Sequence, residues 1–182
     1  MGDGDELEAW LADGYAPAYR TAWLILHNRA DAEEAVQEAF LRAWRFRAAV
    51  PAGDGVRPWL YRVVVNACLS KLRAESRHRG QAIIEADTAN LTNLDGNGPE
   101  EATVAAELRR AVIAAMGALP EHLRVVVALR YYAGLSEKEI AGVIHRRPGT
   151  VKSRLHEARS RLGRDAGLAG LVARGELSGE GS

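Results

Sequence analysis

Apolar residues recur at helical spacing along nearly the whole chain, and this periodicity limits the fold more than any other feature. From position 31 onward the spacing is i, i+3, i+4 and i+7, with Ala32, Ala35, Val36, Ala39, Phe40 and Ala43 on one face. A second stripe, within 57–79, holds Leu60, Val64, Ala67, Cys68 and Leu72. The valines at 63–65 alone would suit a strand, but their flanks are helical. We therefore expect an all-α fold.

Turn chemistry divides this helical chain in two. The run at 95–99, Asp-Gly-Asn-Gly-Pro, is typical of a linker. We expect a first helical domain at 1–79, a flexible acidic linker at 80–107, a second helical domain at 108–166 and a fraying Gly/Ser-rich tail at 167–182. Prolines are expected outside helices or at helix starts, as at Pro120, and Gly134 is expected to end the helix that Pro120 begins.

The zero net charge conceals a strong segregation of charge along the chain. Residues 20–79 carry eleven bases against six acids, and 121–164 carry ten bases against four acids. The segment 1–19 has five acids and 80–108 has six, without a base in either. Two basic blocks between acidic segments indicate two surfaces for a polyanion, with solvated helix faces as the alternative.

Several functional classes are not expected from this composition. Cys68 is the one cysteine and lies in an apolar stretch, which predicts a buried structural thiol in a reducing cytosol. No apolar run approaches the roughly 18–20 residues of a membrane span, and no signal pattern opens the chain, so we expect a cytoplasmic protein without membrane insertion. Metal-ligand spacing, a phosphate loop and a nucleophile constellation are lacking, so we expect no enzyme, catalytic residue, metal or cofactor.

Two short helices with a tight turn between them are predicted near the C-terminal end. Ser136 and Glu139 have the spacing of a capping box, a break follows at 145–147, and Pro148 opens a second helix. This pattern predicts a helix-turn-helix, whose second helix enters the major groove of DNA. Its buried stripe would be Val151, Leu155, Ala158 and Leu162, with Gly149, Ser153, His156 and Glu157 opposite. A plain helical hairpin with a solvated basic face is the alternative.

These residues closely resemble region four of the sigma-70 family, in its extracytoplasmic-function (ECF) group. The resemblance rests on 119–120, 129–131, 136–141 and the specific run Gly-Thr-Val-Lys-Ser-Arg-Leu at 149–155. It implies contact with an upstream promoter element through Arg146, Arg147, Thr150, Lys152, Ser153, Arg154, His156 and Glu157. His145 replaces a common turn glycine, but histidine tolerates positive φ better than most residues. Arg147 replaces a common capping serine, and Glu157 replaces a frequent arginine.

The segment 31–40 resembles the polymerase-binding helix of region two in the same family. We expect Asp31 to cap this helix, with Glu34 completing a capping box. The resemblance implies contact with the clamp helices of the polymerase β′ subunit through Asp31, Glu34, Gln37, Glu38, Leu41 and Arg42. Without the resemblance, these acids would be interpreted as a solvated helix face.

The segment from 57 onward resembles the part of region two that melts promoters. Aromatic faces stack on unpaired bases, and basic side chains hold the backbone. The resemblance implies minus-ten contacts by Arg57, Trp59, Tyr61, Arg62, Asn66, Lys71, Arg73 and Arg77. Trp59 lies on the expected core side, which favours packing, and the loop 47–56 resembles the family's specificity loop.

The resemblance covers about 20–79 and 108–164 and implies a transcription initiation factor. Such a protein binds core RNA polymerase through the β′ clamp helices and the β flap, recognises two promoter elements and melts DNA. An anti-sigma factor would be a further partner. Two alternatives stay open: a helix-turn-helix regulator that never replaces a sigma factor, and a protein that only sequesters polymerase. The promoter sequence is not predictable from these residues.

Overall fold

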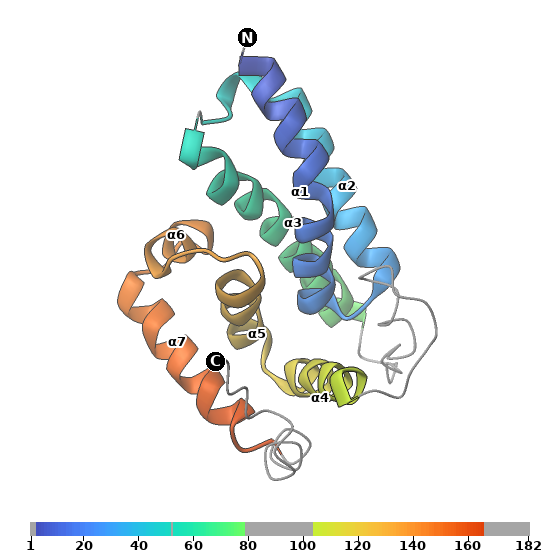
Figure 1. Ribbon diagram of the computed structural model, residues 1–182, viewed down its shortest axis with the longest axis vertical. Helices are drawn as coiled ribbons and strands as arrows, with labels where there is room; N and C mark the ends of the chain where they lie inside the picture. The colour runs from blue at the N-terminus through green and yellow to red at the C-terminus, as the bar shows by residue number, and fades with distance from the viewer. Residues whose placement is uncertain (1–2, 52, 79–103, 166–182) are drawn as a thin grey trace.

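The computed structural model describes residues 3–51, 53–78 and 104–165, and every element in these ranges is helical (Figure 1). The helices are α1 (Asp3–Leu26), α2 (Arg29–Arg45), α3 (Val56–His78), α4 (Val104–Ala118), α5 (Glu121–Val127), α6 (Glu137–Val143) and α7 (Pro148–Leu162). Two 3-10 turns, Arg47–Ala49 and Gly53–Gly55, join α2 to α3, and a π-helical turn, Ala128–Tyr132, follows α5. The all-α prediction is confirmed.

Two boundaries differ from the sequence-based expectation. The helix α4 begins at Val104, within the segment expected as linker, while the rest of that linker and the tail lie outside the described residues. The cap of α2 is Asn28, whose side-chain oxygen accepts a hydrogen bond from the Asp31 amide at 3.0 Å. The prediction of Asp31 as the cap was wrong because α2 already begins at Arg29. Asp31 instead lies in the first turn, where a carboxylate favours the positive end of the helix.

Proline placement also differs from the expectation. Pro17 lies inside α1, where its missing N–H leaves the carbonyl of Asp13 without a helical donor. Asp13 is exposed, so water can satisfy that carbonyl. Pro120 is the N-cap of α5 rather than its first helical residue.

Two predicted helix ends are confirmed. Ser136 caps α6 in a capping box, with Glu139 Oε2 accepting from the Ser136 amide at 2.7 Å. These hydrogen bonds lower the pKa of the Glu139 carboxyl. Gly134 follows the π-helical turn with φ +67°, a left-handed conformation that glycine adopts without steric cost.

The buried faces of α2 and α3 are those that the periodicity predicts. On α2 the small residues Ala32, Ala35, Val36, Ala39 and Ala43 are buried, and on α3 Leu60, Val64, Ala67, Cys68 and Leu72 are buried. Small side chains on α2 allow α1 and α3 to pack closely against it. Burial raises the pKa of the Cys68 thiol to about 12, so the thiol stays protonated and unreactive, as expected of a structural cysteine.

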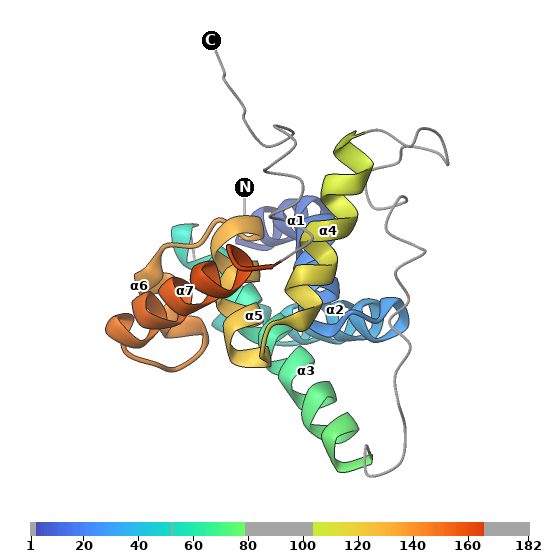
Figure 2. The same ribbon diagram turned by 90° about the horizontal axis from the view of Figure 1, so that it is seen from below.

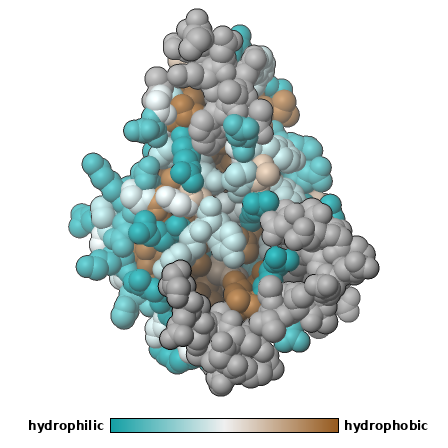
Figure 3. Space-filling view, in the orientation of Figure 1, coloured by the Kyte–Doolittle hydropathy of each residue, from teal (hydrophilic) through white to brown (hydrophobic). Residues whose placement is uncertain are grey.

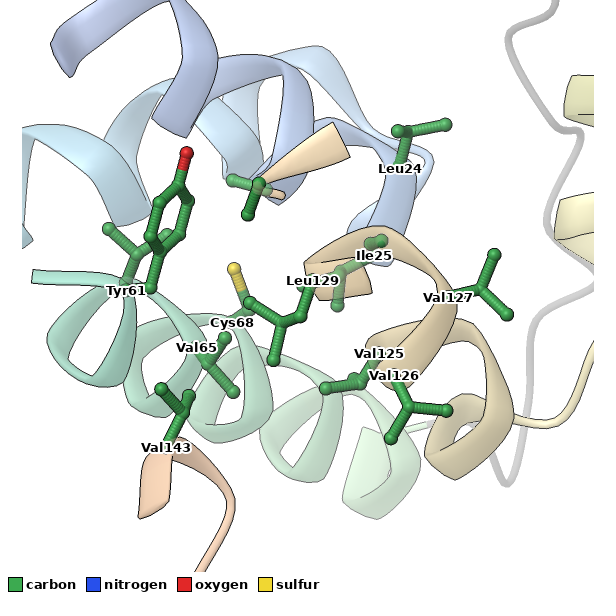
Figure 4. Packing of buried hydrophobic residues seen from close by; sticks show 14 of the residues in the cluster. Leu24, Ile25, Tyr61, Val65, Cys68, Val125, Val126, Val127, Leu129 and Val143 are labelled. Atoms are coloured by element: carbon green, nitrogen blue, oxygen red, sulfur yellow. The ribbon is translucent and has the colours of Figure 1, made fainter. Parts of the chain in front are cut away.

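The two helical blocks share one hydrophobic core. Leu129, after α5, lies near Cys68 of α3 and Ile25 of α1, and Val143, on α6, lies near Val65 of α3 (Figure 4). Figure 2 shows α5, α6 and α7 gathered beside α1 and α3, with α4 across the end of α5. The C-terminal helices therefore cover one side of α3. Fully burying a leucine such as Leu129 there stabilises the packing of the two blocks by about 1.5–3 kcal/mol.

A half-buried histidine lies at the junction of the two blocks. His27 forms the turn between α1 and α2 with φ +52°, and its ring lies 5.4 Å from that of Trp23. Its Cε1 atom is only 3.4 Å from the position that a Cβ at Gly117 would take, so the glycine makes room for the ring at the end of α4. Burial, and then the nearby Arg124 guanidinium, lower the pKa of His27 to about 4.

We expect this histidine to make the fold sensitive to acid. Between pH 6.5 and 4 the unfolded chain binds a proton at His27 that the folded chain does not, so stability falls as the pH drops through this window. His27→Asn tolerates the positive φ and has no proton to bind, so its urea-unfolding free energy should change less between pH 7 and 4.5. The exposed His122 on α5 is the control, because His122→Asn should keep the wild-type dependence. Identical pH profiles for all three proteins would contradict this assignment.

Candidate nucleic-acid interface

Helices α6 and α7 form the predicted helix-turn-helix. His145 enters the turn with φ +51°, and the Arg146 amide donates to the carbonyl of Ala141 at 3.0 Å. The histidine thus takes the left-handed conformation that glycine would otherwise provide. Arg147 is the N-cap of α7 and makes no side-chain capping bond, as its replacement of serine predicted.

The faces of α7 are divided as the periodicity predicts. Val151, Leu155 and Ala158 are buried, and Leu162 packs partly against the core. The opposite face exposes Lys152, Ser153, His156 and Glu157, with Thr150 and Arg154 half-buried at its sides. Glu157 is ion-paired with Arg161 at 2.9 Å, so part of its charge is compensated within the helix. An exposed polar face at the start of a helix matches the way a recognition helix meets base edges.

The residues expected to contact the minus-ten element are not equivalent in the structure. Arg62, Asn66 and Arg73 are exposed on α3. Arg57 is also exposed, but it donates a hydrogen bond to the carbonyl of Ala133 in the C-terminal block. Trp59 is half-buried against the core, as expected of a packing residue. The side chain of Arg77 lies outside the described residues.

The prediction that Tyr61 contacts the minus-ten element was wrong. Its side chain is only 3% exposed, because α1 and the C-terminal helices cover this side of α3. Burial raises the pKa of its hydroxyl, which lies beside Thr21 and Arg57. In this arrangement the ring cannot stack on an unpaired base.

Lys71 is a second correction. Its Nζ lies 3.1 Å from Asp31 Oδ1 and 2.7 Å from Glu34 Oε2, and its side chain is 18% exposed. Burial acts to lower the pKa of Lys71, but the hydrogen bonds that its ammonium donates to Glu34 and Asp31 outweigh the burial and raise the pKa. The ammonium thus joins α3 to α2 rather than facing DNA, and two of the predicted polymerase contacts are its partners.

The outer face of α2 combines paired charges with exposed apolar side chains. Arg42 and Glu38 form an i,i+4 ion pair at 2.5 Å, and Gln37 is exposed. Leu41 is 58% exposed, and the last turn and C-cap of α2 also expose Trp44 and Phe46, by 43% and 62%, which the sequence analysis missed. The available signal was the i,i+3 spacing of Leu41 and Trp44 on the side opposite the buried alanines.

Metal and membrane sites do not feature in the described part of the chain. Within it, no three His, Cys, Asp or Glu side chains gather as metal ligands. No described helix has the length and apolar character to cross a membrane.

Comparison with known proteins relates these surfaces to a family. Residues 13–78 match the family model for sigma-70 region 2, and 109–162 match that for sigma-70, region 4. The chain is 34% identical over 137 residues to the ECF RNA polymerase sigma-E factor of Escherichia coli, covering 72% of each protein. The chain belongs to the sigma-70 family, in its ECF group. It is also 31% identical over 143 residues to the RNA polymerase sigma-H factor of Pseudomonas aeruginosa, covering 76% of this chain and 74% of that protein.

Two solved structures have the same fold. The sigma factor RpoE, in complex with the anti-sigma factor NepR from Bartonella quintana, matches with a TM-score of 0.65 and 22% identity over 93% of this chain and 96% of that one. CnrH, in complex with the cytosolic domain of CnrY, matches with a TM-score of 0.62 and 21% identity over 94% and 91%. This sigma factor is a transcription initiation factor that directs core RNA polymerase to promoters, and members of its family are not enzymes.

The assignment of Lys71 to the α2–α3 contact predicts a measurable coupling. In a double-mutant cycle with Lys71→Met and Asp31→Asn, we expect a coupling of about 1 kcal/mol in urea unfolding, because both groups are partly shielded from water. The more exposed Arg42–Glu38 pair is the control, with an expected coupling of about 0.3–0.5 kcal/mol. Promoter binding by Lys71→Met should keep the wild-type salt dependence. A smaller slope of log affinity against log salt for Lys71→Met would instead mean that Lys71 contacts DNA.

Proposed function

We propose that this sigma factor reads an upstream promoter element with α7, contacts the minus-ten element with α3 and docks on core polymerase with α2. The observation that carries the proposal is α7 itself. It buries most of its apolar stripe within the helix-turn-helix and leaves Lys152, Ser153 and His156 exposed. Arg146 and Arg147 precede it, and Thr150, Arg154 and Glu157 flank its exposed face.

For polymerase docking, we infer that the apolar patch of Leu41, Trp44 and Phe46 is the centre and that the charged residues form the rim. Exposed ion pairs such as Arg42–Glu38 contribute little to folding or binding, whereas desolvated aromatic side chains often dominate interfaces. The Arg47 guanidinium lies 5.2 Å from the Trp44 ring centre and holds that ring at the end of α2. Gln37 and Glu38 lie on the same helix, where they would meet the β′ clamp helices.

For the minus-ten element, we propose Arg62, Asn66 and Arg73 as the contacts available on the exposed side of α3. Arg57 could join them only after its guanidinium leaves the carbonyl of Ala133 in region 4. The loop from 47 to 56 lies next to this surface in the chain and would receive a flipped base.

A groove between α4 and the end of α7 is a further candidate surface, which we assign to the β flap. It holds about 200 Å³ and is lined by Ala115, Leu119 and Leu162, with Arg161 and Asp165 among its polar residues. Figure 3 shows hydrophobic residues in the lower part of this face, where α4, α5 and α7 lie. Apolar grooves with a polar rim suit an apolar segment of a partner.

We also propose that an anti-sigma factor binds this chain and that the chain acts in the cytoplasm, where RNA polymerase works. Support comes from the solved sigma factor RpoE, which is in complex with the anti-sigma factor NepR, and from CnrH, which is in complex with the cytosolic domain of CnrY.

Run-off transcription with purified core polymerase tests the proposed function. The full chain should support specific transcripts from a pool of genomic promoter fragments, and core polymerase alone should not. A helix-turn-helix regulator that is not a sigma factor, or a protein that only sequesters polymerase, could not start these transcripts. A chain that binds DNA without ever initiating would contradict the proposal.

Leu41→Asp tests the docking surface. Leu41 is exposed, so the melting temperature should stay within about a degree, while a charge placed in an apolar contact should abolish co-purification with core polymerase. Ala30→Asp, at an exposed position in the first turn of the same helix, is the matched control and should bind normally. Normal holoenzyme assembly by Leu41→Asp would place docking elsewhere.

Lys152→Ala tests the role of α7. Loss of one phosphate contact should weaken binding across promoter sequences and lower the slope of log affinity against log salt by about one. Arg29→Ala removes an exposed charge from the start of α2, away from the proposed docking patch, and should leave the slope unchanged. Equal effects of the two substitutions, measured by fluorescence anisotropy with the holoenzyme, would mean that α7 does not face the DNA backbone.

A further inference from the structure

A basic cleft lies where region 2 meets the helix-turn-helix. It holds about 640 Å³, and its walls come from α3, α6, the turn and the start of α7. The polar lining residues are Arg62, His145, Arg146, Arg147 and Thr150. Gly142 lines the cleft without a side chain, which leaves room beside Arg62. A Cβ at this position would lie 3.9 Å from Arg62 Nη2. The cleft therefore exists only while the two blocks are packed together.

The charges in this cleft are not compensated by the residues around them. Three guanidinium groups line it, and no carboxylate does. Arg146 donates to the carbonyl of His145, whereas Arg62 and Arg147 have no hydrogen bond or ion pair to another described side chain. Elsewhere on the described surface Lys71, Arg42 and Arg161 each have a carboxylate partner. Like charges that converge without a counter-charge repel each other, so a bound anion would stabilise this arrangement.

The start of α7 adds to the positive potential of the cleft. The helix has 15 residues, and its N-cap, Arg147, provides no side-chain acceptor for the amides of the first turn. The positive end of the α7 dipole thus lies at the cleft. At the N-cap, the guanidinium of Arg147 stands where a side-chain oxygen would usually cap the helix. The hydroxyl of Thr150 adds a neutral hydrogen-bonding group.

We propose that this cleft binds a small molecule that carries two or more phosphoryl groups. Guanidinium groups bind phosphate oxygens in pairs, and three of them match more than one phosphoryl group. A volume of about 640 Å³ suits a small ligand. Because the lining residues come from both blocks, the ligand stabilises the packed arrangement, by about 100-fold at 100 times its Kd.

The consequence for transcription rests on the proposed function. Arg62 is assigned there to the minus-ten element, and Arg146 and Arg147 to the upstream element. One occupied cleft therefore withdraws side chains from both DNA contacts, and a diphosphate ligand competes with promoter binding.

Titration calorimetry of the full chain with inorganic pyrophosphate tests the site. We expect saturable binding, a higher melting temperature in pyrophosphate, and much weaker binding of inorganic phosphate. A nucleoside diphosphate that binds more tightly than pyrophosphate would identify a nucleotide as the source of the phosphoryl groups. Arg62→Gln and Arg147→Gln should each weaken pyrophosphate binding about tenfold or more. Arg159→Gln, which removes an exposed charge outside the cleft, should have no effect.

Gly142→Leu blocks the cleft without changing its charge. It should abolish pyrophosphate binding while run-off transcription, measured without pyrophosphate, stays at the wild-type level. No binding to the wild type, or equal weakening by Arg159→Gln, would overturn the proposal. Loss of short-duplex binding in Gly142→Leu would assign the cleft to the DNA backbone instead. A wild type that binds pyrophosphate but never initiates would contradict the proposed function and leave the site intact.

Discussion

The burial of Leu129 and Val143 against Val65 and Cys68 is the contact on which the rest of the structure depends. It packs the C-terminal block against both α1 and α3, while α2 packs against α1 and α3 as well. The exposed part of α3 is reduced to the strip that carries Arg62, Asn66 and Arg73. The helix expected to contact the minus-ten element is thus also the centre of the core.

The positions of the ion pairs depend on the apolar packing, and the ion pairs themselves contribute little to holding the helices together. Lys71 reaches two carboxylates of α2 because packing brings α2 and α3 together, and exposed pairs such as Arg42–Glu38 add little. Arg62, Arg146 and Arg147 line a cleft without a carboxylate where the two blocks meet. Their arrangement depends on the packed state, and so would any function that uses it.

Left-handed residues occur at the turns where the packing changes direction. His27 turns the chain from α1 to α2, Gly134 ends the π-helical turn, and His145 sets the angle between α6 and α7. The sequence predicted the last two, because turn glycines and histidines that tolerate positive φ are local signals. It did not single out His27, whose importance comes from its contact with Gly117 at the far end of another helix.

The sequence by itself determined the helices, their buried stripes on α2, α3 and α7, the capping box at Ser136 and the exposed face of the recognition helix. These features depend on periodicity and on neighbours within a few residues, which the sequence records directly. Only the tertiary structure decided that Tyr61 is buried, that Lys71 bonds to Asp31 and Glu34, and that Arg62 shares a cleft with the turn at 145–147. An aromatic or basic side chain at the edge of a buried apolar stripe can either face solvent or pack against another helix. The choice depends on which distant helix covers that edge, and the spacing of residues along one helix contains no information about this.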